Sequence, residues 1–184
     1  MLNELISEVR VLLASTNERP VLVVIDGPAG AGKSTLAARI VEEIGAGEII
    51  HCDDLYNGWD DALTETFQEH LQQWILDPLS QGQMPRYQKY DWSSRAFSPS
   101  VALGRSALII LEGVGCAIEK VTKAADLTIW IDIPYHVGLE RVLQRDGEEI
   151  RNEMLRWLDR QREYFELNSN RENCDIHIDQ PSYL

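Results

Sequence analysis

A glycine-rich segment between two strongly patterned stretches constrains the fold more than any other part of the sequence. Before it, residues 21–25 form a continuous apolar run rich in β-branched side chains, which is typical of a strand buried on both faces. After it, the spacing predicts a helix over 33–44 that ends at Gly45. The segment between them fits the pattern G-x-x-x-x-G-K-[ST] at every specified position, as Gly27-Pro28-Ala29-Gly30-Ala31-Gly32-Lys33-Ser34. Strand, loop and helix in this order are the context in which that pattern binds phosphate.

Each part of the pattern has a physical reason in a phosphate site. Glycines let successive main-chain N–H groups turn toward one phosphate, and the helix adds its positive N-terminal end. We expect Lys33 to reach the β- and γ-phosphates of ATP or a similar nucleoside triphosphate, Ser34 to ligate Mg²⁺, and Thr35 to support the site. The alternative is a glycine turn that precedes a lysine by chance. Such a turn would have no reason to lie between a predicted strand and a predicted helix. The predicted nucleotide-binding residues are Gly27, Pro28, Ala29, Gly30, Ala31, Gly32, Lys33, Ser34 and Thr35.

The charge of the chain excludes some classes of partner. Its 17 basic and 30 acidic residues give a formal net charge of −13, whereas binding to a nucleic-acid backbone or an anionic membrane needs a basic face. A nucleotide site stays compatible with this charge, because distant surface charges are screened over about 8 Å at physiological salt. We therefore expect a small-molecule acceptor as the partner, with no nucleic acid and no membrane, and leave a homo-oligomer open.

The length and the cysteines indicate one cytoplasmic domain over residues 1–184. The three cysteines are far apart and form no CxxC, so they favour buried thiols in a reducing compartment over a disulfide framework or a zinc site. The first helix is interrupted by Glu4, Glu8 and Arg10 and does not read as a signal peptide. No apolar run approaches the roughly 20 residues that a membrane span needs.

Strands and helices alternate along the rest of the chain. Further strands are predicted at 48–52, 107–111, 126–133 and 175–178, and further helices at 2–13, 61–79, 135–145 and 148–168. The stretch 80–100 is polar, aromatic and rich in proline, and it is too long for an ordinary loop, so it is either a functional excursion or a weakly marked hairpin. The pattern predicts an α/β fold, a three-layer sandwich around a parallel sheet.

Acidic residues follow several predicted strands. Ligands of open parallel sheets bind at the carboxyl ends of the strands, and phosphoryl transfer needs one carboxylate near Mg²⁺ and one that takes the proton of the acceptor hydroxyl. Glu112 follows an apolar strand in the manner of a Walker B carboxylate and is the predicted metal residue beside Ser34, although a strand-end carboxylate also caps loops. Asp132 precedes a proline and fits ordinary turn chemistry better. Asp26, Asp53 and Asp54 end the first two strands.

From residue 21 to 179 the chain resembles the uridine kinase-like branch of P-loop kinases, the relatives of phosphoribulokinase and pantothenate kinase. His51-Cys52-Asp53-Asp54-Leu55-Tyr56 is similar to the family's Asp-x-Phe-Tyr motif, Tyr90-Asp91-Trp92 to its Tyr-Asp-Phe hairpin, and Glu112-Gly113 to its Glu-Gly. The resemblance implies that Asp53 is the catalytic base, that 85–95 forms a hairpin over the acceptor site, and that 141–146 begins a lid. It also implies a five-stranded parallel sheet in the order 2-3-1-4-5.

Two features of the family are missing. Ser93-Ser94-Arg95 stands where the family has a histidine, and Gly147-Glu148-Glu149 replaces its second arginine cluster. In the first part of the lid, Arg141 and Arg145 lie four residues apart on one helix face. We expect Arg145 to act in catalysis and Arg141 to contact the nucleotide. The alternative is that both arginines only pair with neighbouring glutamates on the surface, and Arg151 could then take the role in the lid.

Aromatic residues gather in the predicted loops rather than on helical stripes. Flat rings suit a planar or sugar-like acceptor, so Tyr56, Tyr90 and Trp92, together with Arg95, are the predicted substrate-binding residues, with loop packing as the alternative. Trp74 and Trp157 lie on helical stripes and are expected in the core. His51 is expected to be a hydrogen-bonded strand-end histidine.

The sequence thus predicts a kinase that transfers the γ-phosphate of ATP to a hydroxyl of a small acceptor such as a nucleoside, with Asp53, Lys33 and Arg145 as catalytic residues. One alternative is a regulatory nucleotide-binding protein without catalysis. Another is a nucleoside monophosphate kinase, which needs cations for the acceptor phosphate; Arg86, Lys89 and Arg95 are available for that role.

Overall fold

A five-stranded parallel sheet forms the centre of the protein. The structure, a computed structural model, describes residues 1–15 and 19–179, so the break expected after the first helix at 17–20 lies partly outside it. The strands lie in the order β2-β7-β1-β8-β9, which is the expected 2-3-1-4-5 when only the strands of this sheet are counted along the chain. Their bounds are β1 Val21–Asp26, β2 Glu48–His51, β7 Leu108–Glu112, β8 Leu127–Asp132 and β9 Ile176–Asp179.

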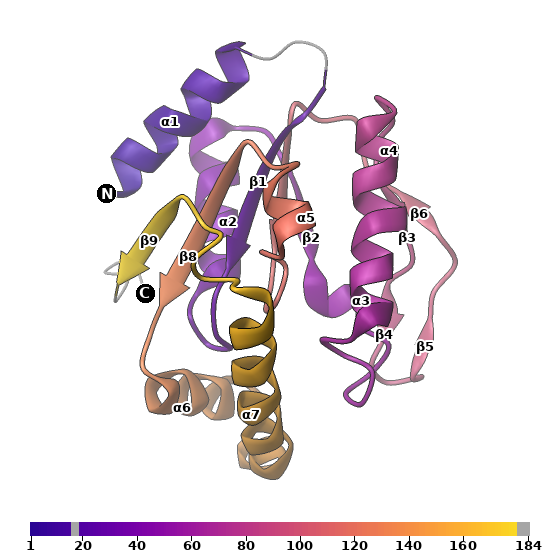
Figure 1. The fold of residues 1–184 in the computed structure, drawn as a ribbon, viewed down its shortest axis with the longest axis vertical. Coiled ribbons are helices and arrows are strands. Elements are labelled where there is room, and N and C mark those ends of the chain that lie inside the picture. Colours follow the sequence, from indigo (N-terminus) through magenta and orange to yellow (C-terminus); the bar gives the residue numbers. More distant parts are fainter. Residues whose placement is uncertain (16–18, 180–184) are drawn as a thin grey trace.

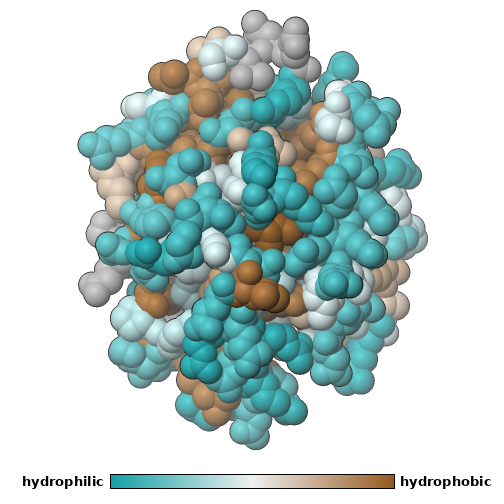
Figure 2. Space-filling view, viewed as in Figure 1, coloured by the Kyte–Doolittle hydropathy of each residue, from teal (hydrophilic) through white to brown (hydrophobic). Residues whose placement is uncertain are grey.

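Helices cover both faces of the sheet, as a three-layer sandwich requires (Figure 1). Strand β1 is buried on both faces, and its successive side chains belong alternately to the two hydrophobic clusters on either side of the sheet. Val23 and Ile25 pack toward α1 and α2, whereas Leu22 and Val24 pack toward the opposite layer. Polar side chains cover most of the surface seen in Figure 2. The helices are α1 Leu2–Ser15, α2 Lys33–Ile44, α3 Glu65–His70, α4 Asp77–Ser80, α5 Glu119–Thr122, α6 Tyr135–Asp146 and α7 Arg151–Asn168.

Several boundaries differ from the sequence-based prediction. The helix expected over 61–79 begins at Glu65, because the Thr64 hydroxyl bonds to Asp61 and holds residues 61–64 as a turn. It continues from α3 through a π-helical stretch, Leu71–Leu76, into α4. The last predicted helix begins with a 3₁₀ turn, Glu148–Ile150, before α7.

The long polar stretch contains short strands that pair with each other. Strand β4 (Tyr90–Asp91) pairs antiparallel with β5 (Ala96–Phe97), and β3 (Arg86–Tyr87) pairs with β6 (Val101–Ala102). Asp91 fixes the hairpin tip by accepting hydrogen bonds from the Ser93 main chain at 2.9 Å and hydroxyl at 2.7 Å. These bonds to Ser93 and Ser94 lower the pKa of Asp91 to about 2. The weakly marked hairpin is thus the correct alternative for this stretch.

The three cysteines are buried, as the sequence predicts. Cys52, Cys116 and Cys174 are all buried free thiols. Among the helices that the structure describes, none combines the length and the apolar character that crossing a membrane requires.

A buried carboxylate joins the loops at the carboxyl edge of the sheet. Asp26 ends β1 and is fully buried. One of its oxygens accepts from the main-chain N–H groups of Gly27 at 2.6 Å and Gly115 at 2.8 Å. The other accepts from Ala117 N at 2.8 Å and Asn170 Nδ2 at 2.9 Å. Burial raises the pKa of Asp26, and these donors oppose that effect. The phosphate loop, the β7–α5 loop and the α7–β9 connection therefore share one anchor.

Substituting Asp26 by Asn should destabilise the fold. An amide replaces one acceptor oxygen by an NH₂ group, which leaves two buried N–H donors facing another donor. We expect Asp26→Asn to lose about 2–3 kcal/mol of unfolding free energy and about 5–10 °C in Tm. Thermal unfolding measures this, with the exposed Asp60→Asn as the matched control. Equal melting temperatures for the two variants would contradict the anchor role.

Candidate active site

The phosphate loop has the conformation that its sequence predicts. Helix α2 begins at Lys33 without a side-chain cap, so its first N–H groups point out of the helix unpaired by any side chain. Lys33 is buried, and its Nζ donates to the carbonyl oxygens of Gly27 and Pro28, both at 2.9 Å. Gly30 has φ +76°, and a Cβ there would lie 2.4 Å from the carbonyl oxygen of Gly138 in α6. The loop is thus held closely against α6.

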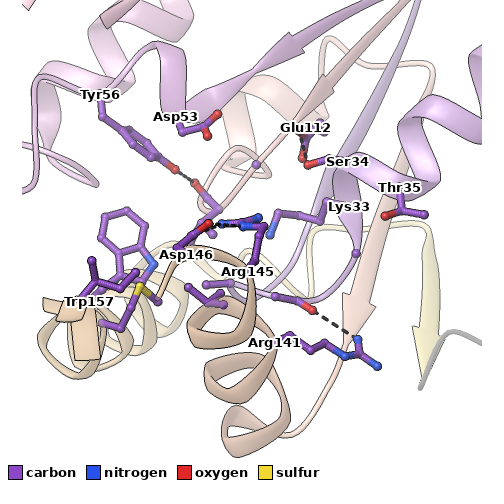
Figure 3. Close-up of a pocket in the computed structure, with 18 of the residues that line it drawn as sticks. Lys33, Ser34, Thr35, Asp53, Tyr56, Glu112, Arg141, Arg145, Asp146 and Trp157 are labelled. Atoms are coloured by element: carbon purple, nitrogen blue, oxygen red, sulfur yellow. Dashed lines mark hydrogen bonds and ion pairs between the residues drawn. The ribbon is translucent and has the colours of Figure 1, made fainter. Parts of the chain in front are cut away.

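A cavity of about 440 Å³ opens at this loop and gathers most of the predicted residues. Figure 3 shows Lys33, Ser34 and Glu112 on one side of it and Arg145 between them and α7. The buried Gly27, Pro28 and Ala31 form the back of the loop and do not reach the opening. The predicted residues that line the cavity are Ala29, Gly30, Gly32, Lys33, Ser34, Thr35, Asp53, Tyr56, Trp92, Glu112, Arg141 and Arg145.

Glu112 connects the phosphate loop to the end of β2. Strand pairing sets His51 directly beside Glu112. Glu112 Oε1 accepts from the Ser34 hydroxyl at 2.9 Å and lies 2.5 Å from His51 Nδ1. Burial alone would raise the pKa of Glu112, but the His51 hydrogen bond, the Lys33 charge and the Ser34 hydrogen bond outweigh burial and lower it. The same hydrogen bond raises the pKa of His51. His51 is thus the hydrogen-bonded strand-end histidine that we expected.

Asp53 and Asp54 have different surroundings although they are adjacent. Asp53 lines the cavity, whereas the Asp54 carboxylate lies 2.8 Å from Lys89 Nζ, outside it. The cavity walls displace part of the water around Asp53, and this effect, followed by the negative charges of Glu112 and Asp54, raises its pKa. Of the two carboxylates, only Asp53 is therefore in a position to contact a ligand in the cavity.

The arginines of α6 flank the cavity from the side opposite to β2. Arg141 Nη1 donates to the Gly30 carbonyl at 3.3 Å. Arg145 forms two hydrogen bonds to its neighbour Asp146, at 2.6 and 2.7 Å, while still lining the cavity. Arg151 pairs with Glu148 outside the cavity, at 2.8 Å. Arg145 and Arg141, but not Arg151, therefore face the space beside the phosphate loop.

The predicted substrate residues divide between two cavities. Tyr56 lines the first as a wall, because its hydroxyl donates to the Val114 carbonyl at 2.6 Å and its ring is buried. Tyr90 and Arg95 line a second, adjacent cavity of about 470 Å³, and Trp92 lines both. Lys89, also considered for an acceptor phosphate, is paired with Asp54.

Some residues of the site were not identified from the sequence. Trp157, expected in the core, is buried but also forms a wall of both cavities. Gln161 is fully buried, and its side-chain oxygen accepts from the Ala29 N–H at 3.2 Å, which supports the phosphate loop from α7. Gln161 continues the buried helical stripe of Met154, Trp157 and Tyr164. The sequence signal that could have identified Gln161 is a glutamine at a position where the helical pattern calls for an apolar residue.

The side chains at the loop fit a magnesium nucleotide. Mg²⁺ keeps several waters and is usually held by one or two protein oxygens together with substrate phosphates. Ser34 and Glu112 provide a hydroxyl and a carboxylate in contact, and Lys33 supplies a cation that can move from two carbonyls to a phosphate. In the part of the chain that the structure describes, no group of three or more His, Cys, Asp or Glu side chains forms a metal cage of its own.

Comparison with known proteins identifies partial relatives in sequence. No protein-family model matches the chain. It is 30% identical over 151 residues to "Inorganic pyrophosphatase TTM1" from Arabidopsis thaliana, covering 75% of this chain and 23% of that protein. It is 27% identical over 145 residues to TTM2 of the same plant, covering 73% and 21%. The chain thus spans less than a quarter of the length of either relative.

Solved structures match over nearly the whole chain. A possible uridine kinase from Bacillus stearothermophilus has a TM-score of 0.63 at 18% identity, covering 96% of this chain and 100% of that one. A putative fructose transport system kinase from Silicibacter sp. TM1040 has 0.64 at 18%, covering 96% and 98%. D-glycerate 3-kinase from Cryptococcus neoformans has 0.63 at 15%, covering 92% and 89%. The chain has the P-loop kinase fold that the resemblance to uridine kinase-like proteins implies.

The His51–Glu112 pair should make stability depend on pH in a defined direction. Because the pKa of His51 is raised, the folding stability that its pairing contributes is fully present below the ordinary value of 6.5. This stability is lost as pH rises through the raised value. Because the pKa of Glu112 is lowered, the folding stability that Glu112 contributes is fully present above its ordinary pKa of 4.5. We expect the Tm difference between the unaltered protein and His51→Gln to be greatest between about pH 4.5 and 6.5 and to shrink toward pH 9.

Melting curves across this pH range check the expectation. His136→Gln, at an exposed position of α6, is the matched control. Because the His51 side chain is partly open to solvent, the difference should be modest. A difference that stays constant, or that grows toward alkaline pH, would contradict the pairing.

Proposed function

We propose that this protein is a kinase that transfers the γ-phosphoryl group of ATP to a hydroxyl of a small acceptor. The observation that carries the proposal is the position of Asp53. It lines the same cavity as Lys33, Ser34 and Glu112, although it comes from the end of a different strand. A protein that only binds and senses a nucleotide needs no carboxylate at this position, whereas a kinase needs a group that orients the attacking hydroxyl.

Each group of residues around the cavity has a separate role in the proposed reaction. Main-chain N–H groups of Gly30, Gly32, Lys33 and Ser34, together with the Lys33 ammonium, bind the phosphates and offset the charge that develops on them. Asp53 orients the acceptor hydroxyl and takes its proton as the new O–P bond forms and the bond to the departing ADP breaks. Arg145 supplies positive charge from α6. Ser34 and Glu112 would hold Mg²⁺, which would offset the charge of the phosphates when bound.

A nucleoside is the acceptor that the sequence resemblance favours, and it would lie between Asp53 and the aromatic walls of Tyr56 and Trp92. Of the cations considered for a nucleoside monophosphate kinase, Arg95 lines the second cavity, whereas Lys89 pairs with Asp54 and neither Lys89 nor Arg86 lines either cavity. A regulatory nucleotide-binding role is tested together with the kinase, since that role predicts nucleotide binding without acceptor-stimulated ADP release.

Lys33→Ala should weaken MgATP binding and abolish transfer. The buried ammonium would lose its contacts with phosphate, and charge-assisted hydrogen bonds contribute about 1.5–3 kcal/mol each. We therefore expect the Kd for ATP to rise by about tenfold or more, measured by calorimetry. Because Lys33 also bonds to two loop carbonyls, circular dichroism of the variant verifies the fold. An unchanged affinity in a folded variant would refute the phosphate-loop assignment.

Asp53→Asn should bind MgATP almost normally but lose kcat by about 10²-fold or more, because an amide cannot take the hydroxyl proton. Asp54→Asn is the matched control and should be milder, since Asp54 pairs with Lys89 outside the cavity. Steady-state ADP release, with and without a panel of hydroxylated acceptors, measures both variants. A fully active Asp53→Asn beside an inactive Asp54→Asn would reverse the assignment. Nucleotide binding without stimulation by any acceptor would favour the regulatory role.

A further inference from the structure

The second cavity adjoins the proposed active site and shares a wall with it. Trp59, Trp92 and Trp157 line both cavities. Their rings are in contact, with centroids 5.3 Å apart for Trp59 and Trp92 and 5.6 Å for Trp59 and Trp157. Trp59 and Trp92 remain 40% and 38% exposed, which is unusual for such large apolar side chains. A molecule whose hydroxyl lies at Asp53 would pass these rings to enter the second cavity.

Three arginines line the second cavity. Its lining contains Arg95 from the β4–β5 hairpin and Arg156 and Arg160 from α7. It contains two acidic residues, Asp60 and Glu153. Basic residues are outnumbered 17 to 30 in the whole chain, yet they outnumber acidic ones here. This local excess of cations opposes the overall charge of the protein.

The arginines keep donors available for a ligand. Among the residues that the structure describes, Arg95 has no acidic side chain within ion-pair distance. Arg156 is only loosely paired with Glu153, at 3.4 Å. Arg160 uses one Nη to bond to the Trp59 carbonyl, which holds the Trp59 loop against α7. The guanidinium group presents five N–H donors in a fork that matches phosphate and carboxylate oxygens.

Arg95 occupies a position that a glycine would occupy with less strain. Its φ is +56°, in the left-handed region that side chains other than Gly, Asn and Asp rarely adopt. The residue ends the tip of the β4–β5 hairpin, where such a conformation lets the chain turn.

We propose that the second cavity binds an anionic group of the acceptor, a phosphate or a carboxylate, remote from the hydroxyl that receives the phosphoryl group. The inference rests on the proposed kinase function and narrows the substrate to a hydroxylated small molecule with an anionic end. The tryptophan rings enclose the body of that molecule, and Arg95, Arg156 and Arg160 hold its anionic end. This binding positions the hydroxyl at Asp53, since a ligand fixed at both ends loses less freedom in the reaction.

Matched pairs of compounds test the inference by binding and by turnover. The pairs are ribose and ribose 5-phosphate, glycerol and glycerate, glycerol and glycerol 3-phosphate, and uridine and its 5′-monophosphate. Quenching of tryptophan fluorescence reports binding beside the tryptophans that both cavities share, without requiring transfer; its dependence on Arg95 and Arg156 assigns the binding to the second cavity, and ADP release in MgATP reports turnover. The variants are Arg95→Met and Arg156→Met, with Arg105→Met as the matched control, because Arg105 is exposed and lies before β7 at the opposite edge of the sheet.

At least one anionic compound should bind about tenfold or more tightly than its neutral partner, since a charge-assisted hydrogen bond is worth at least this factor. Arg95→Met and Arg156→Met should each remove most of that preference, and Arg105→Met should keep it. Equal binding of neutral and anionic partners, failure of every anionic compound to bind, or an unchanged preference in Arg95→Met overturns the inference. If only neutral acceptors are phosphorylated, the result supports the proposed kinase function and contradicts the proposed anion site. Arginine-dependent binding without any ADP release supports the site and refutes the kinase.

Discussion

The carboxylate of Asp26 has no contact with solvent, and the arrangement of the active site depends on how it is satisfied. Four N–H donors from three separate loops converge on it, and none of the four belongs to a charged side chain. Burying a charge in this way is costly unless hydrogen bonds compensate, so the loops must adopt the one arrangement that supplies the donors. The start of the phosphate loop is thereby fixed relative to the loop that follows Glu112 at the end of β7. The residues proposed to bind nucleotide and metal, which come from different strands, are thus held next to one another by the protein itself.

A second constraint is the distribution of charge at the sheet edge. Glu112, Asp53 and Asp54 would repel one another, and each has a different compensation. His51 and Ser34 bond to Glu112, Lys89 pairs with Asp54, and Asp53 is left with a raised pKa facing the cavity. The Lys33 ammonium bonds to two loop carbonyls and would exchange them for phosphate oxygens. In a chain with a net charge of −13, an anion site can exist only through such local arrangements.

Local patterns account for the elements that could be predicted. Strand β1, the phosphate loop and α2 follow from an apolar run, glycines at fixed spacing and a capping glycine, and their bounds agree with the structure within one residue. The hairpins within residues 80–102 have strands of two residues, too short for a periodic signal. The contacts of Asp26 and Gln161 join residues more than 80 positions apart, which no local pattern encodes. The division of the aromatic residues between two cavities likewise depends on how the hairpin meets α7.

The destination of the γ-phosphate tests the central claim most directly, because the curated relatives carry the name of a hydrolase and the fold is that of kinases. The protein is incubated with ATP labelled in the γ-phosphate, Mg²⁺ and a mixture of small metabolites, and the labelled products are separated. Our account predicts label in an organic phosphate ester, and loss of that product in Asp53→Asn. Label released only as inorganic phosphate, or retained in ATP with every mixture, would contradict it.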